Sequence, residues 1–344
     1  MKARWFKYVL QFKVPGGTSR GVLREKPSWF FHFEKVGKPG IGECGLLPGL
    51  SVDDRPYYES KLDEVVQAFN HGEEIPNLRD WPSIAFGWEM AMADLHADKK
   101  HQLFPSSFTE GSAGIDINGL VWMGKPETMR QQIDEKLRAG FHCIKLKIGA
   151  VDFADELNLI RHIRKDYSAA DITIRVDANG AFSPTDAPEK LSRLAEFDLH
   201  SIEQPIAAGN WDVMAALCAN SPLSIALDEE LIGITDDAQM ESLMSTIRPQ
   251  AIILKPSLLG GFAPCDQWIT LAEKHKTTWW ATSALESNIG LNAIAQYTFT
   301  KNNPLPQGLG TGQLYTNNFD SPLEIVNGKL FYFNEKEWDD PKGL

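Results

Sequence analysis

The sequence contains few cysteines, no long apolar run and no excess of basic charge. Four cysteines occur among 344 residues, and none belongs to a Cys-x-x-Cys pair. Neither a disulfide framework nor a zinc knuckle is therefore predicted, and isolated thiols are typical of the reducing cytoplasm. No apolar run reaches the roughly 18 residues of a membrane-spanning helix, and the charged first eight residues do not resemble a signal peptide. We expect a cytoplasmic protein.

Acidic residues outnumber basic ones. The counts are 46 Asp and Glu against 34 Lys and Arg, which gives a net charge of −12. This excess argues against nucleic acid as a partner, since that requires a basic surface, and against docking on anionic membranes. The eight histidines do not form a His-Glu-x-x-His zinc motif. The length corresponds to about two domains, with no need for staples to stabilise the core.

The first 112 residues predict a small α+β domain. Aromatic and β-branched runs broken by charges are typical of antiparallel strands, and apolar residues at helical spacing follow them. Between the first two strands, Pro15–Gly21 contains adjacent glycines and is predicted to be a mobile loop. The expected strands are Trp5–Val14, Trp29–Glu34 and Gly42–Gly45, and the expected helices are Tyr57–Asn70 and Pro82–Asp98.

From residue 113 the pattern alternates between short apolar strands and helices. This alternation predicts an α/β fold: a modified (β/α)7β TIM-type barrel over 113–344 with a short C-terminal tail, preceded by an α+β capping domain over 1–112. The alternative is an open doubly wound sheet. The expected strands are Ile115–Trp122, Ile144–Ile148, Ile172–Asp177, Ser201–Gln204, Leu223–Leu227, Ala251–Leu254, Thr278–Ala281 and a short segment near Gly308–Gly310, and the expected helices begin at Pro126, Phe153, Ser183, Trp211, Thr235, Ala263 and Asn288.

Ionisable residues occur near the ends of these strands, where barrels of this type have their active sites. Lys145 and Lys147 are two positions apart in one strand, so both point to the same face. Two lysines inside a barrel require compensation by anions. We therefore expect carboxylates close to them.

Three successive strands end in carboxylates. Asp177, Glu203 and Asp228 are separated by 203 − 177 = 26 and 228 − 203 = 25 residues, about the length of one βα unit. Neighbouring parallel strands would place them side by side, where they repel one another unless a cation lies between them. Oxygen ligands on a rigid base suit Mg²⁺, with Mn²⁺ as the alternative.

A third lysine, Lys255, ends the sixth strand of the barrel, on the far side of the mouth from Lys147. A metal that holds a substrate carboxylate makes the adjacent C–H more acidic, and a desolvated lysine beside it suits a general base. The implied chemistry is proton abstraction next to the carboxylate of a small molecule.

Together these motifs resemble the enolase superfamily, in its muconate-lactonizing-enzyme subgroup, over nearly the whole chain. The resemblance implies that Asp177, Glu203 and Asp228 bind Mg²⁺. It implies that Lys147 is the acid/base and Lys255 the opposite lysine, while Lys145 supports the base electrostatically. The residues that would orient these ligands without contacting the metal are Asn179, Arg175 and Glu229.

Within this subgroup, Gly308–Tyr315 is similar to the o-succinylbenzoate synthases of menaquinone biosynthesis. The resemblance implies a Mg²⁺-dependent syn dehydration of 2-succinyl-6-hydroxy-2,4-cyclohexadiene-1-carboxylate through a metal-stabilised enediolate, a carbon–oxygen lyase reaction. Lys255 would face the delocalised intermediate as a cation over a π-system. Pro15–Gly21 and Leu46–Gly49 would close over the cavity. Candidate substrate contacts are Ser283, Gly310, Thr311 and Arg20.

Two other functions remain open. Dipeptide epimerases and N-succinylamino acid racemases share the scaffold, and racemisation needs a base on each face of the α-carbon, which Lys147 and Lys255 would supply. The Asp-x-Asp with which epimerases bind the substrate ammonium is absent, although Glu286 lies in that region. The third hypothesis is an idle barrel with a binding or structural role. The sequence does not indicate an oligomeric state.

Overall fold

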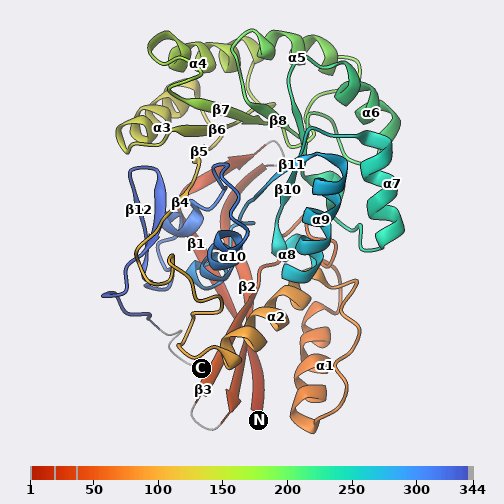
Figure 1. The fold of residues 1–344 in the computed structure, drawn as a ribbon, viewed down its shortest axis with the longest axis vertical. Helices are drawn as coiled ribbons and strands as arrows, with labels where there is room; N and C mark the ends of the chain where they lie inside the picture. The colour runs from red at the N-terminus through yellow and green to blue at the C-terminus, as the bar shows by residue number, and fades with distance from the viewer. Residues whose placement is uncertain (1, 19–20, 36–37, 340–344) are drawn as a thin grey trace.

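The computed structural model describes residues 2–18, 21–35 and 38–339. Its N-terminal part is a three-stranded antiparallel sheet in the order β1-β2-β3 with two helices packed against it (Figure 1). Aromatic side chains hold sheet and helices together: the Phe33 ring of the sheet lies 5.1 Å from the Trp88 ring. We call this unit the cap. Its elements are β1 (Lys2–Thr18), β2 (Gly21–Lys35), β3 (Lys38–Cys44), α1 (Tyr58–His71) and α2 (Pro82–His96).

The prediction of a mobile loop at Pro15–Gly21 is wrong for most of this segment, because β1 continues to Thr18 and β2 starts at Gly21. The β1–β2 pairing shifts register between Gln11 and Gly16, and the hairpin then continues to the barrel. Here the glycines permit close approach: a Cβ on Gly17 would lie 2.3 Å from the carbonyl oxygen of Met123. This backbone also accepts a hydrogen bond from the Met123 N–H.

The rest of the chain forms the predicted barrel. Seven parallel strands pair in the order β11-β10-β9-β8-β7-β6-β5. Helices α3–α7 form an arc outside the strands from β5 to β9 (Figure 1). The strands are β5 (Gly119–Val121), β6 (Cys143–Lys147), β7 (Thr173–Asp177), β8 (Ser201–Glu203), β9 (Ile225–Leu227), β10 (Ala251–Leu254) and β11 (Thr278–Ala281). The helices are α3 (Pro126–Arg138), α4 (Phe153–Asp166), α5 (Ala187–Ala195), α6 (Trp211–Asn220), α7 (Asp237–Ile247), α8 (Pro256–Leu259), α9 (Phe262–His275) and α10 (Asn288–Thr300), with 3₁₀ turns η1 (Glu229–Leu231) and η2 (Thr311–Gln313).

Two residues, Gln307 and Gly308, close the barrel where a short last strand near Gly308–Gly310 was predicted. Gln307 bridges Ile117 on one edge of the sheet, and Gly308 bridges Thr282 on the other. The expected first strand, Ile115–Trp122, is in fact divided. Its first part, β4 (Ile115–Asp116), pairs antiparallel with the C-terminal segment, and only β5 belongs to the barrel.

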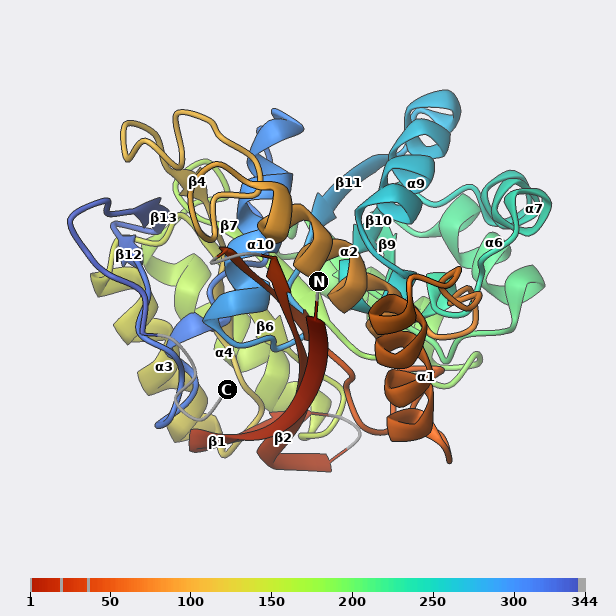
Figure 2. The same ribbon diagram turned by 90° about the horizontal axis from the view of Figure 1, so that it is seen from below.

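The C-terminal segment folds back beside the barrel as β12 (Leu323–Val326) and β13 (Lys329–Tyr332), which pair with β4. Figure 2 shows this sheet and α1 on opposite sides of the β1–β2 hairpin. The segment before it contacts the cap, because the Tyr8 hydroxyl donates to the carbonyl of Asn317 at 2.8 Å. The predicted domain boundary after residue 112 stays a prediction.

One predicted helix start differs appreciably. The helix expected from Ser183 begins as α5 at Ala187, because the Ser183 hydroxyl accepts from the N–H of Asp186 in a preceding turn. Across the part of the chain that the structure describes, the helices are too short or too polar to cross a membrane. The four cysteines are all buried and free.

Candidate active site

Strand register brings the predicted lysines and carboxylates together. Lys147 on β6 is the direct neighbour of Asp177 on β7, which in turn is the neighbour of Glu203 on β8. Alternation along each strand aims these side chains into the barrel, while Leu146 and Val176 between them enter the core outside it. Asp228 follows β9 directly, so the next strand adds the third carboxylate.

The carboxylates of Asp177, Glu203 and Asp228 form a compact buried cluster. One oxygen from each lies within 4.8 Å of the others. Burial raises the pKa of Glu203 despite Lys145, and the two neighbouring acids raise it further. One oxygen of Glu203 is buried without a hydrogen-bond partner. A buried, unsatisfied carboxylate oxygen in a group of three acids fits a divalent cation, so these residues could hold a metal.

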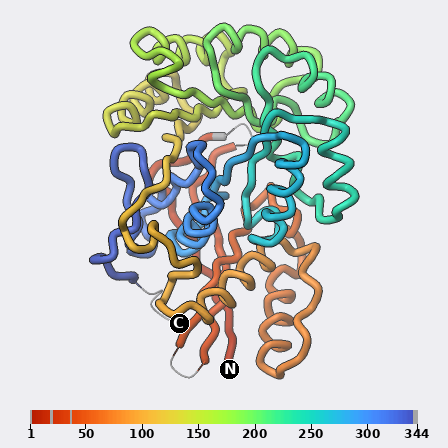
Figure 3. The backbone as a smooth tube through the Cα atoms, in the orientation of Figure 1, coloured from red at the N-terminus to blue at the C-terminus, as the bar shows by residue number. Residues whose placement is uncertain are grey.

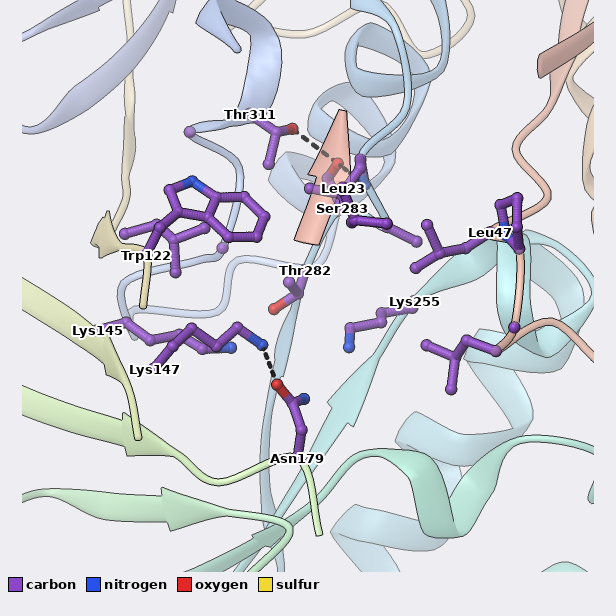
Figure 4. A pocket seen from close by; sticks show the side chains of 18 of the residues that line it. Leu23, Leu47, Trp122, Lys145, Lys147, Asn179, Lys255, Thr282, Ser283 and Thr311 are labelled. Carbon is purple, nitrogen blue, oxygen red and sulfur yellow. Dashed lines mark hydrogen bonds between the residues drawn. The ribbon is translucent and has the colours of Figure 1, made fainter. Parts of the chain in front are cut away.

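The three lysines reach the cluster from two sides. Lys145 Nζ lies 2.5 Å from Glu203 Oε2 and 2.9 Å from Asp177 Oδ2, and Lys147 Nζ lies 2.6 Å from Asp177 Oδ2. Lys255 donates to Asp228 from the opposite side. Figure 4 shows Lys145 and Lys147 facing Lys255 across the cavity. This is the arrangement predicted from the sequence.

The environments of these lysines differ in their effect on protonation. Burial lowers the pKa of Lys147, and the nearby charges of Lys145 and Lys255 lower it further, against the opposing effect of Asp177. Burial acts on Lys145 in the same direction, but Asp177, Glu203 and Asp228 outweigh it and raise the pKa of Lys145. Lys147 is therefore the member of the Lys145–Lys147 pair suited to exchange a proton, while Lys145 stays charged.

Two of the expected supporting residues lie where they can orient the site. Asn179 accepts a hydrogen bond from Lys147 Nζ at 2.8 Å and donates to Glu229 at 2.9 Å. Gln204, which the sequence did not single out, accepts from the backbone N–H of Asp228 at 3.2 Å and donates to Glu230 at 2.9 Å. Its backbone φ of 36° brings the chain sharply out of β8.

The position of Arg175 differs from the one expected for a residue that orients the metal ligands. Its guanidinium donates to the carbonyl of Pro306 at 2.7 Å and lies 3.9 Å from the centre of the Trp280 ring, inside the barrel. Within the described residues it makes no hydrogen bond to a metal-cluster carboxylate. It precedes Asp177 by two positions on the same face, which places it one layer deeper. Arg175 therefore acts on the cluster only through its charge and packs the barrel floor.

A cavity of about 300 Å³ lies above the lysines, between the barrel mouth and the cap. Lys145, Lys147 and Lys255 form its polar floor, and no carboxylate belongs to its described lining. The rest of the wall is apolar or made of hydroxyl and backbone groups. The other lining residues are Gly21, Val22, Leu23, Leu47, Pro48, Gly49, Leu50, Asn118, Leu120, Trp122, Asn179, Thr282, Ser283, Ala284, Leu285, Gly308, Gly310 and Thr311.

Three of the four candidate substrate contacts line this cavity. The Ser283 and Thr311 side chains share a hydrogen bond of 2.8 Å, and Gly310 lies beside them. Figure 4 shows Ser283 and Thr311 on the side away from Lys147. Arg20, the fourth candidate, lies outside the described residues.

The cap contributes to the same cavity. Gly21 and Leu23 come from the start of β2, and Leu47 and Gly49 follow β3, so both segments expected to cover the cavity reach it. Trp122, which the sequence analysis placed in a strand without a role, also lines the wall (Figure 4). An indole directly after a barrel strand is the signal that could have indicated it.

Glu286, which the sequence analysis considered as an ammonium ligand, does not line the cavity. Its carboxylate is fully buried behind the wall and accepts hydrogen bonds from Ser257 Oγ at 2.5 Å and Ser283 Oγ at 2.7 Å. This carboxylate is therefore hydrogen-bonded to two serine hydroxyl groups and does not face a substrate.

Comparison with known proteins agrees with this geometry. Residues 128–334 match the family model described as "Enolase C-terminal domain-like". The chain belongs to this family. The o-succinylbenzoate synthase of Desulfotalea psychrophila is 47% identical over 96% of this chain and 98% of its own length. The predicted enolase-superfamily enzyme is thus confirmed.

Solved structures of this superfamily have the same fold. The crystal structure of MenC from Desulfotalea psychrophila superimposes with a TM-score of 0.86 and 43% identity, over 96% of this chain and 99% of that one. The L-Ala-D/L-Glu epimerase of Bacillus subtilis superimposes with a TM-score of 0.80 over 96% of both chains. At 18% identity, the epimerase indicates a shared fold alone.

Proposed function

We propose that this enzyme is an o-succinylbenzoate synthase. It would dehydrate 2-succinyl-6-hydroxy-2,4-cyclohexadiene-1-carboxylate to o-succinylbenzoate as a carbon–oxygen lyase. The observation that carries the proposal is the cavity lining, which combines three lysines with apolar walls and no described carboxylate. Such a cavity suits a ring with two carboxylates and disfavours an ammonium group. The 47% identity to a named synthase supports the same reaction.

The metal of this site is assigned to the three carboxylates. Asp177, Glu203 and Asp228 supply oxygen ligands only, which favours Mg²⁺, with Mn²⁺ as the alternative. When bound, the ion supplies positive charge that stabilises the substrate carboxylate as its α-carbon loses a proton. Lys145 adds a permanent positive charge beside Asp177 and Glu203.

Lys147 is assigned the proton transfers. Its lowered pKa favours the neutral amine that removes the proton from the ring carbon next to the carboxylate. The same Nζ then returns a proton to the hydroxyl on the neighbouring carbon, which departs as water from the same face. The ring becomes aromatic and the hydrogens balance. Asn179, bonded to Nζ at 2.8 Å, holds the amine in position.

Lys255 and the far wall are assigned to the remaining parts of the substrate. Lys255 faces the ring as a cation, since burial lowers its pKa but Asp228 and Glu229 outweigh this and raise it. The backbone at Gly310 and Thr311, beside the hydrogen-bonded Ser283 and Thr311 hydroxyls, would receive the succinyl carboxylate. Trp122 and Leu47 shield the ring from water.

One observation favours a second activity, racemisation of N-succinylamino acids. Lys147 and Lys255 lie on opposite sides of the cavity, as a two-base racemisation requires (Figure 4). An N-succinylamino acid also carries two carboxylates and no ammonium. The N-succinylamino acid racemase of Amycolatopsis sp is 25% identical over 92% of this chain.

A substrate panel tests the proposal. The purified enzyme with Mg²⁺ is given the cyclohexadiene substrate, N-succinylamino acids and L-Ala-D/L-Glu in separate reactions. We expect the aromatic product from the first and no epimerised dipeptide from the third. Absence of o-succinylbenzoate would contradict the synthase. Turnover of the cyclohexadiene would place the enzyme in menaquinone biosynthesis, which we assign to the cytoplasm.

A further inference from the structure

A second set of buried charges lies behind the cavity wall, outside the metal cluster. Lys26 on β2, Glu43 on β3 and Glu286 after β11 are each at most 1% exposed. Buried charges persist where they are paired and hydrogen-bonded, so each requires specific partners. None of the three is used by the dehydration as assigned above.

The cap supplies the first half of this network. Lys26 Nζ donates to Ser28 Oγ at 2.8 Å, and Ser28 Oγ donates to Glu43 at 2.8 Å. Glu43 then accepts from the backbone N–H of Ser287 at 3.0 Å and of Gly290 at 3.1 Å. The carboxylate therefore lies at the N-terminus of α10, where the helix dipole favours an anion. This contact fixes the cap against the barrel.

Glu286 supplies the second half and joins two segments of the cavity wall. It receives one hydrogen bond from Ser257, two residues after Lys255, and one from Ser283, which contacts Thr311. Burial raises the pKa of Glu286, with Lys26 as the main opposing influence. A Cβ on Gly45 would lie 2.9 Å from Glu286 Cγ, so the carboxyl has little freedom to move.

We propose that Glu286 is a positioning residue that sets the direction of the Ser283 and Thr311 hydroxyls in the cavity. Its carboxyl holds Ser283 Oγ in one rotamer, and Ser283 in turn orients Thr311 through their shared hydrogen bond. Because Ser283 donates to Glu286, Thr311 donates the hydrogen bond that the two hydroxyls share, and its side chain is fixed against the wall. The backbone at Gly310 and Thr311 then keeps one position in which to receive the substrate's second carboxylate, which strengthens binding. The inference rests on the proposed function, which supplies that carboxylate.

A double-variant cycle tests this inference. Steady-state kinetics on the cyclohexadiene substrate are measured for Glu286→Gln, Ser283→Ala and the double variant. Each single change is expected to raise KM about tenfold, which is about 1.4 kcal/mol, and to lower kcat by no more than about threefold, since the reacting atoms lie at Lys147. Because Glu286 acts through Ser283, the double variant should have the KM of Ser283→Ala alone.

Glu89→Gln is the matched control. Glu89 is also a carboxylate whose pKa is raised by burial, and it accepts from the N–H groups of Phe262 and Ala263 at the start of α9, away from the cavity. This change is expected to lower the melting temperature and leave KM unaltered. A purely structural role for Glu286 would give the same pattern as Glu89, and would overturn the inference.

The remaining outcomes are also decisive. If Glu286→Gln does not fold, Ser283→Ala, Thr311→Val and their double variant are measured instead. A KM increase in the double variant that is smaller than the product of the two single increases supports the hydrogen-bonded hydroxyl pair. Unchanged KM in both single variants, with an active wild type, overturns this inference and leaves the synthase intact. A wild type without turnover overturns both.

Discussion

At the scale of single residues, function depends on which charges share a partner. Lys145 and Lys147 both contact Oδ2 of Asp177, yet their pKa values shift in opposite directions. Lys145 lies between two carboxylates, whereas Lys147 has one carboxylate and an amide. A shift of two positions along β6 thus separates a fixed cation from a proton carrier.

Replacement of a carboxylate tests the metal assignment. Asp177→Asn should weaken Mg²⁺ binding by at least about tenfold, because an amide oxygen carries no charge to offset the ion. Isothermal titration calorimetry measures the affinity. Asp171→Asn is the control, since this exposed aspartate accepts hydrogen bonds from Ser168, away from the metal cluster. Equal Mg²⁺ affinity in Asp177→Asn and wild type would show that the ligand assignment is wrong.

At the scale of elements, close backbone approach lets the cap pack on itself and on the barrel. Helix α2 crosses β3 where two glycines meet: a Cβ on Gly42 would lie 1.9 Å from the carbonyl oxygen of Gly87. Gly16 and Gly17 permit the hairpin to approach Trp122 and Met123 in the same way. Gly16 and Gly17 thereby let the hairpin lie against Trp122, which lines the cavity.

Substitution at the helix crossing tests this packing. An alanine at Gly87 gains about 1 kcal/mol of helix propensity, but its Cβ would lie 2.4 Å from Cys44 Sγ and 2.9 Å from Cys44 N. Overpacking of this kind costs about 1–3 kcal/mol, and backbone cannot move aside cheaply. We expect net destabilisation in urea unfolding. Gly124→Ala, with no neighbour nearer than 3.9 Å, is the control. Increased stability of Gly87→Ala would contradict this account.

At the scale of the whole molecule, the barrel and its charged residues could be predicted from the sequence because they repeat. Carboxylates at Asp177, Glu203 and Asp228 recur with the period of one βα unit, and parallel register places them together. No comparable period exists for contacts between distant segments. Glu43 and Ser287 lie 244 positions apart, and nothing local indicates that they meet.

The lack of a local signal for contacts between distant segments also explains where the predictions from the sequence differ from the structure. The glycines at 16 and 17 have the composition of a mobile loop, and only the barrel strand end beside them shows that they serve close packing. Arg175 shares a face with Asp177, but Trp280 and Pro306 hold it in the floor. Figure 3 shows the N-terminal trace passing beside the C-terminal part of the chain, and the hydrogen bond from Ser287 to Glu43 is one contact between these distant segments.

The most direct test of the central claim is the rate of o-succinylbenzoate formation by Lys147→Ala compared with wild type, both with saturating Mg²⁺. Loss of the proton carrier is predicted to slow the reaction by about 10²–10⁴-fold, while circular dichroism stays unchanged and Mg²⁺ binding is not weakened, since the change removes a cation from Asp177. Lys274→Ala, which removes an exposed lysine paired with Glu241, should retain the wild-type rate. A wild-type rate in Lys147→Ala would contradict the assignment of Lys147 as the base.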